Sequence, residues 1–177
     1  MDVSPLVFDI ETAALLNAGD YLEPISAARN LTDPAKIAAD IEKRTAERED
    51  KLALDWNVGR IVGLGFWCEA NGDEVLICRD EDDERDALQL FWAVSKHRLL
   101  VGFNAKGFDC RYLVQRSRLL GVVHPSLDLG KYSRRGIIDL YLELTFNDGT
   151  YDQGAMRRTL KAFARRFGIP VNDASDG

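Results

Sequence analysis

The feature that most restricts the fold of this 177-residue chain is an Asn71-Gly72 pair between two strand-like segments. Residues 60–68 and 73–78 have the composition of strands, and Asn-Gly between two such runs is a strong hairpin signal. The two segments are therefore predicted to be antiparallel neighbours. A short apolar run at residues 6–10 predicts an earlier strand, buried on both of its faces.

After the hairpin, strand and helix patterns alternate. Residues 82–95 have helical periodicity, and their expected buried positions are Leu88, Phe91, Trp92 and Val94. The remaining predicted elements are strands at 99–103 and 136–140 and helices at about 108–120 and 156–167. This order predicts an α/β fold in a single domain of residues 1–177: a mixed five-stranded sheet flanked by helices, the arrangement of the ribonuclease-H-like fold. The order alone is also compatible with several other α/β folds.

A charged segment at about residues 19–56 separates the first strand from the hairpin. Asp33-Pro34 places a capping residue before a proline, which predicts the start of a helix. Apolar residues are sparse from 34 to 54, so this part is expected to form one or two solvent-rich helices. The helical insert at 34–54 is a candidate docking surface for a protein partner.

Composition indicates where in the cell the protein is expected and which side chains are available to bind a metal. The three cysteines lack CxxC spacing and there are two histidines, which favours reduced thiols in a cytoplasmic protein. A metal site would then consist of carboxylates, the ligands that suit Mg²⁺ or Mn²⁺. No apolar run is long enough to span a membrane, so a membrane partner is not expected.

Basic residues concentrate in the second half of a chain whose net charge is −6. Residues 96–170 hold 14 Lys and Arg against 6 Asp and Glu. A basic surface that follows a phosphate backbone and a set of solvated helix faces are both consistent with this distribution. The basic residues in question are Arg111, Arg116, Arg118, Lys131, Arg134, Arg135, Arg157, Arg158, Lys161, Arg165 and Arg166.

Two groups of polar residues follow predicted strands. Asp9 and Glu11 stand two apart at the end of the first strand, so their side chains share one face. A bound divalent cation would compensate such acids, whereas the alternative is an ordinary solvated turn. In the second group, Asn104 follows a strand, and Phe108-Asp109 opens a helix. The helix dipole accounts for an early Asp by itself, but not for the whole combination.

Phe8-Asp9-Ile10-Glu11-Thr12 and the segment from Asn104 to Asp109 resemble the first two motifs of the DEDD (DnaQ-like) 3′→5′ exonuclease superfamily. The resemblance is greatest to predicted exonucleases akin to the proofreading domains of family B DNA polymerases. It implies metal-dependent removal of 5′-mononucleotides from single-stranded or frayed 3′ ends of DNA or RNA, in replication or repair.

The same resemblance implies the roles of individual residues. Asp9, Glu11 and Asp109 would be catalytic and would hold two Mg²⁺ or Mn²⁺ ions. Thr12, Asn104, Lys106 and Phe108 would contact the terminal nucleotide, and a core position is the alternative for Phe108.

The third motif of the superfamily has no counterpart in this sequence. That motif is an Asp on a late helix, preceded by Tyr or His; the matching spacing at His124 to Asp128 contains a proline and precedes the last predicted strand. The catalytic helix at the C-terminus is therefore expected to be missing. The chain is then a piece of a longer nuclease, relies on a second chain for the fourth acid, or binds nucleic acid or protein without cleavage. Asp139 could approach the site, although a capping role is the favoured interpretation.

Overall fold

The structure is a computed structural model that describes residues 4–145 and 159–171. Its strands are β1 (Pro5–Ala14), β2 (Gly59–Cys68), β3 (Gly72–Ile77), β4 (Leu99–Gly102) and β5 (Ile137–Asp139). Its α-helices are α1 (Pro34–Glu49), α2 (Glu81–Ser95), α3 (Asp109–Leu119), α4 (Leu140–Leu144) and α5 (Leu160–Arg166), and its 3₁₀ helices are η1 (Ala18–Tyr21) and η2 (Leu52–Leu54). In the described part of the chain, no helix is long and apolar enough to cross a membrane.

The five strands form one mixed sheet in the order β3-β2-β1-β4-β5. β2 pairs antiparallel with both β3 and β1, whereas β4 pairs parallel with both β1 and β5. The predicted hairpin is confirmed, and Gly72 supplies the positive φ of +74° that its turn requires. The predicted α/β fold is confirmed as well.

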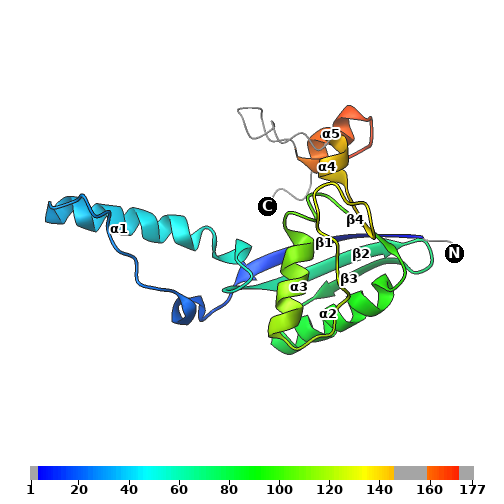
Figure 1. Cartoon of the computed structure of the whole chain (residues 1–177), viewed down its shortest axis with the longest axis horizontal. Coiled ribbons are helices and arrows are strands. Elements are labelled where there is room, and N and C mark those ends of the chain that lie inside the picture. The colour runs from blue at the N-terminus through cyan, green and yellow to red at the C-terminus, as the bar shows by residue number, and fades with distance from the viewer. Residues whose placement is uncertain (1–3, 146–158, 172–177) are drawn as a thin grey trace.

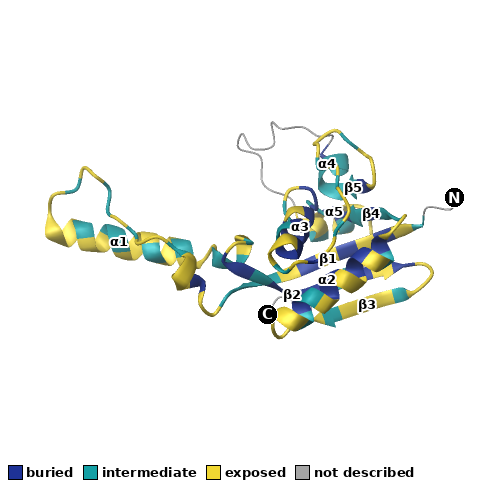
Figure 2. Cartoon of the chain, turned by 60° about the horizontal axis from the view of Figure 1, so that its bottom comes forward, coloured by how far each residue is buried: buried dark blue, intermediate teal, exposed yellow. Residues whose placement is uncertain are grey.

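Packing on one face of the sheet forms the core. Leu6, Phe8 and Ile10 of β1 are buried on this face. The ring of Phe91 in α2 lies 5.3 Å from that of Phe8 and 6.2 Å from that of Phe66, measured between centroids. Figure 2 shows buried residues where α2 and α3 face the sheet. Leu88, Phe91 and Trp92 are buried as predicted, whereas Val94 is half-buried and packs at the margin of the core.

The opposite face of β1 corrects the prediction that this strand is buried on both sides. Val7, Asp9 and Glu11 alternate with the core residues and are exposed. The strand continues to Ala14, so the two acids lie within β1 and not at its end. Neighbouring residues on this face are also exposed, as at Val75, which retains 68% of its accessible surface.

The charged insert projects away from the sheet, with α1 at its far end (Figure 1). Asp33 caps α1 as predicted, because its carboxylate accepts a hydrogen bond from the Ala35 amide at 2.9 Å. The segment before the helix runs back along it: the Ala28 amide donates to Asp40 at 2.9 Å. The helix buries none of its residues. No observation tests the predicted protein partner.

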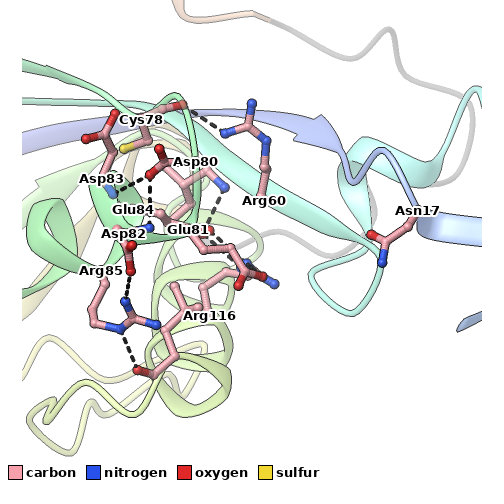
Figure 3. A network of polar contacts seen from close by, with 12 residues as sticks. Asn17, Arg60, Cys78, Asp80, Glu81, Asp82, Asp83, Glu84, Arg85 and Arg116 are labelled. Carbon is pink, nitrogen blue, oxygen red and sulfur yellow. Dashed lines mark hydrogen bonds and ion pairs between the residues drawn. The ribbon is translucent and has the colours of Figure 1, made fainter.

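A buried ion pair fastens α3 to α2 and to β2 (Figure 3). The Arg116 guanidinium donates to both Glu84 oxygens, at 2.8 and 2.7 Å, and the same carboxylate accepts from the Ile61 amide at 3.0 Å. Arg116 is 2% exposed and Glu84 is fully buried. Arg116 therefore positions α3 on the core, which corrects its prediction as a surface residue.

The C-terminal part departs further from the predicted elements. The last strand ends at Asp139, and the short helix α4, which the sequence pattern did not predict, follows at once. The described part of the last helix is Leu160–Arg166, and residues 156–158 of the prediction lie outside the described residues. Arg134 pairs with Glu143 of α4, so this basic residue is also less free than expected.

Candidate active site

A cavity of about 370 Å³ lies where β1, the end of β4 and the start of α3 meet the C-terminal helices. Three predicted site residues besides Asp9 line it: Asn104, Phe108 and Asp109. The strand-to-helix junction and β1 are therefore brought together, as the sequence motifs predict. The other lining residues are Ile10, Phe103, Tyr141, Thr159 and Leu160.

The end of strand pairing places Asp109 beside β1. β4 pairs with β1 only as far as Val7, so the later residues of β1 have no strand partner on that side. The Ile10 amide donates instead to Oδ1 of Asp109, at 3.3 Å. Asp109, the first residue of α3, thus takes the place of a strand partner on this side of β1, and its carboxylate lies next to Asp9.

A tight turn holds Asn104 at the cavity. Asn104 has a φ of +60°, and its carbonyl accepts hydrogen bonds from the amides of Gly107 and Phe108 at 3.0 Å. A Cβ at position 107 would lie 2.5 Å from Oδ1 of Asn104. The turn therefore needs a residue without a side chain at 107 to keep the Asn104 amide in place.

The carboxylate of Asp139 fixes the backbone of this turn. Its two carboxylate oxygens accept hydrogen bonds from the amides of Asn104 and Lys106, each at 2.9 Å, and from the Tyr141 amide at 3.0 Å. Asp139 is 3% exposed and is the N-cap of α4. The capping interpretation is confirmed, and because backbone donors occupy both oxygens, Asp139 is poorly suited to be the fourth acid of the site.

Lys106 does not line the cavity. Its side chain is buried, and Nζ donates to the carbonyl oxygens of Gly130, at 3.0 Å, and Ser133. These bonds tie the loop before β5 to the strand-to-helix turn. The structure therefore gives Lys106 a structural position, which corrects its prediction as a nucleotide contact.

Glu11 and Thr12 lie further along β1. Glu11 is exposed on the same strand face as Asp9 but does not line the cavity. A β-bulge separates Glu11 from Thr12, because the pairing with β2 shifts register between them. Bulges re-aim the side chains that follow them, and half-buried Thr12 also lies outside the cavity lining.

The surroundings of the two cavity carboxylates disfavour their charged forms. Burial raises the pKa of Asp109 to about 6, and the neighbouring Asp9 charge adds to the effect. Asp9 is exposed as a residue, but partial loss of solvent around its carboxylate, followed by the charge of Glu11, raises its pKa. Both shifts are those of acids close together in a site of low polarity.

This donor set partly fits a hard divalent cation. Carboxylate oxygens are the ligands that Mg²⁺ and Mn²⁺ prefer, and a cation would offset the repulsion between Asp9 and Asp109. Over residues 4–145 and 159–171, however, no three His, Cys, Asp or Glu residues are grouped closely enough to hold a metal ion. Asp9 and Asp109 are thus suitable ligand types, but the described residues around them do not make a group of three.

Aromatic residues that the sequence reasoning missed form another wall of the cavity. The rings of Phe103 and Tyr141 meet edge to face with centroids 5.5 Å apart. Phe163 of α5 does not line the cavity, but its ring lies 6.1 Å from that of Phe103. The relevant sequence signals were capping residues: Asp139 begins α4, and Thr159 accepts from an amide of α5. Recognising the Asp139 cap would have predicted α4, and the Thr159 cap would have given the start of α5 within the helix predicted at about 156–167.

Comparisons with known proteins show the fold. No family model and no curated protein matches this sequence. Among solved structures, the chain is similar to the family B DNA polymerase from the hyperthermophilic archaeon Pyrobaculum calidifontis, with a TM-score of 0.55 and 22% sequence identity. The match covers 96% of this chain and 19% of the polymerase chain. This likeness supports the mixed α/β architecture of the ribonuclease-H-like fold.

Proposed function

We propose that this chain is a metal-dependent 3′→5′ exonuclease domain that acts on a single-stranded or frayed end of DNA or RNA. The observation that carries the proposal is the meeting of Asp9 and Asp109 at one cavity, from two segments 100 residues apart in sequence. The likeness to a DNA polymerase supports a nuclease-like domain that contacts nucleic acid.

Asp9 and Asp109 would hold a divalent cation, and Glu11 would join them from the same face of β1. Bound ions of this kind activate water and stabilise the charge that develops at a phosphodiester under attack. The raised pKa values of the two cavity acids support this assignment, because a cation would favour their ionised forms.

The remaining walls suit a terminal nucleotide. Asn104 presents an amide that can donate to or accept from the sugar or base. Phe103, Phe108 and Tyr141 present aromatic surface, on which any base can pack, whatever its sequence. Such a cavity would bind one unstacked nucleotide, which suits action at an end better than within a duplex.

A second candidate is a nuclease-fold domain that binds nucleic acid without cleaving it. The observation in its favour is that no group of three metal-binding side chains occurs within the described ranges. The exposed face of β1, β2 and β3 beside Asp9 and Glu11 leaves space where another segment or chain would supply a further acid.

A 3′-end trimming assay separates the two candidates. The chain is incubated with 5′-labelled single-stranded DNA or RNA in Mn²⁺ or Mg²⁺, beside a D9A/E11A variant. A matched control, D73A/E74A, removes the same charge from exposed positions of β3. An exonuclease gives a metal-dependent ladder that D9A/E11A abolishes and D73A/E74A retains. Binding without a ladder would reject the exonuclease and favour the binding domain.

A further inference from the structure

A second cavity, of about 430 Å³, lies on the outer side of α3 and shares no lining residue with the first. Arg111, Gln115 and Arg118 form one wall. Their spacing of four and three residues puts them on one side of the helix. The loop between α3 and β5 forms the other wall, with His124 and Ser126. We call this cavity the α3 groove.

The α3 groove is electrostatically positive in an acidic chain. No carboxylate lines it among the described residues. Asp128 belongs to the same loop, but its carboxylate is turned to the Gly130 amide at 3.0 Å and the Ser133 hydroxyl at 2.7 Å. The groove therefore attracts an anion.

Its two guanidinium groups are available for a ligand. Both arginines are exposed, and in the described ranges neither forms an ion pair. Arg111 donates through Nε to the Lys106 carbonyl at 2.9 Å, which leaves its terminal nitrogens directed elsewhere. Arg118 makes a contact of 3.5 Å with Gln115. Seven residues along a helix separate the two arginines by about 10 Å, so they would reach different phosphates.

The same groove contains apolar and aromatic surface. Trp56, Val114, Leu127 and Leu129 line it; Val114 belongs to the hydrophobic core, and the other three pack against that core. Trp56 is half-buried and is one of the residues that line the groove. A charged wall beside an aromatic ring is the combination that binds single-stranded nucleic acid, whose bases stack while its phosphates meet arginines.

We propose that the α3 groove binds a segment of single-stranded nucleic acid, with phosphates at Arg111 and Arg118 and a base against Trp56. The choice of nucleic acid as the ligand rests on the proposed function. The groove would hold a part of the strand other than its 3′-terminal nucleotide, because α3 separates the two cavities. It would thereby favour substrates several nucleotides long.

Fluorescence anisotropy with a 5′-fluorescein oligothymidylate, measured in EDTA, tests binding without cleavage. Loss of two phosphate contacts in R111Q/R118Q should weaken binding about 25-fold at 0.1 M salt and make the logarithmic salt slope shallower by about 1.4. The control, K36Q/K51Q, removes two exposed positive charges from the insert and should bind as the unmodified chain does. R118Q alone preserves the Arg111 hydrogen bond. Its loss of affinity, on a logarithmic scale, should be about half of that of R111Q/R118Q.

The base contact has its own test. The unmodified chain should bind oligothymidylate about tenfold more tightly than an abasic oligonucleotide of equal length, and W56L should lose this preference. Unchanged binding by R111Q/R118Q, or an equal loss in K36Q/K51Q, would overturn the proposal. Displacement of the oligonucleotide by a polyglutamate peptide of equal charge at equal concentration would overturn it in favour of an acidic peptide.

The results distinguish a failure of the exonuclease proposal from a failure of the α3 groove proposal. Arginine-dependent binding without any trimming would support the α3 groove and reject the exonuclease. Trimming that R111Q/R118Q leaves unchanged, on short and long oligonucleotides alike, would support the exonuclease and reject the groove.

Discussion

Replacing Asp109 with Asn should stabilise the metal-free chain at neutral pH, at the expense of its proposed activity. Asn is close in shape to Asp and retains an oxygen that can accept from the Ile10 amide, the hydrogen bond that now measures 3.3 Å. It removes the charge that burial and Asp9 oppose. The effect therefore isolates the cost of holding an ionised carboxylate at this cavity.

The sign and size of this effect follow from the pKa. Burial raises the pKa of Asp109 from 3.8 to about 6, so the folded state holds the proton more tightly than the unfolded state. The stabilising contribution is fully present below pH 3.8 and is lost as the pH rises through 6. The complete loss amounts to about 3 kcal/mol, and about 2 kcal/mol of it falls between pH 4.5 and 7.5.

Urea denaturation in EDTA at both pH values measures the difference. The free energy of unfolding of D109N minus that of the unmodified chain should be about 2 kcal/mol larger at pH 7.5 than at pH 4.5. With an ordinary dependence on urea, this corresponds to a change of about 1 M in the relative midpoints. Effects of the substitution that do not depend on pH cancel in this comparison.

If D109N and the unmodified chain differed in stability by the same amount at both pH values, the reasoning would be refuted. It would mean that Asp109 ionises at an ordinary pKa and that the site does not oppose its charge. If D109N gained more stability over the unmodified chain at pH 4.5 than at pH 7.5, the cavity would stabilise the charged form of the carboxylate, contrary to its geometry.

Three further predictions concern the core, the turn and the metal. R116M should lower the free energy of unfolding by about 3–5 kcal/mol in urea denaturation, because it removes the buried cation that pairs with Glu84 and leaves only the Ile61 amide to offset the carboxylate charge; an E84L/R116M double variant should recover most of this loss, and failure to recover it would contradict the argument. G107A should reduce trimming to the level of N104A without reducing oligonucleotide binding at the α3 groove, because its Cβ displaces the Asn104 amide; full activity would show that the turn adapts. In thermal melts, Mn²⁺ should raise the melting temperature of the unmodified chain but not of D9N, and an equal rise in both would place the ion elsewhere.

Local patterns predicted much of the fold. Asn71-Gly72 and Asp33-Pro34 acted through turn and capping preferences that depend on a few neighbouring residues. The apolar periodicity of 82–95 likewise identified α2, and the side that it buries, before any contact was known. The sequence pattern also grouped Asn104, Phe108 and Asp109 at one junction.

Predictions failed where the outcome depended on distant partners. Arg116 was predicted on the helix surface and Lys106 at the terminal nucleotide, yet Glu84 and the carbonyl oxygens of the loop before β5 bind them in the interior. The short helix α4 was missed because its start depends on Asp139, which also fixes the Asn104 turn. A long basic side chain has the same local pattern whether it is buried with a partner or solvated.

The sequence by itself determined the strand and helix order, the hairpin, and the residue types that could form a carboxylate site. Tertiary structure decided which of those residues meet. Asp9 and Asp109 share a cavity because β4 stops pairing with β1 at Val7, and α3 begins in the space that remains. Strand pairing over such separations depends on the whole sheet, so no local pattern can specify it.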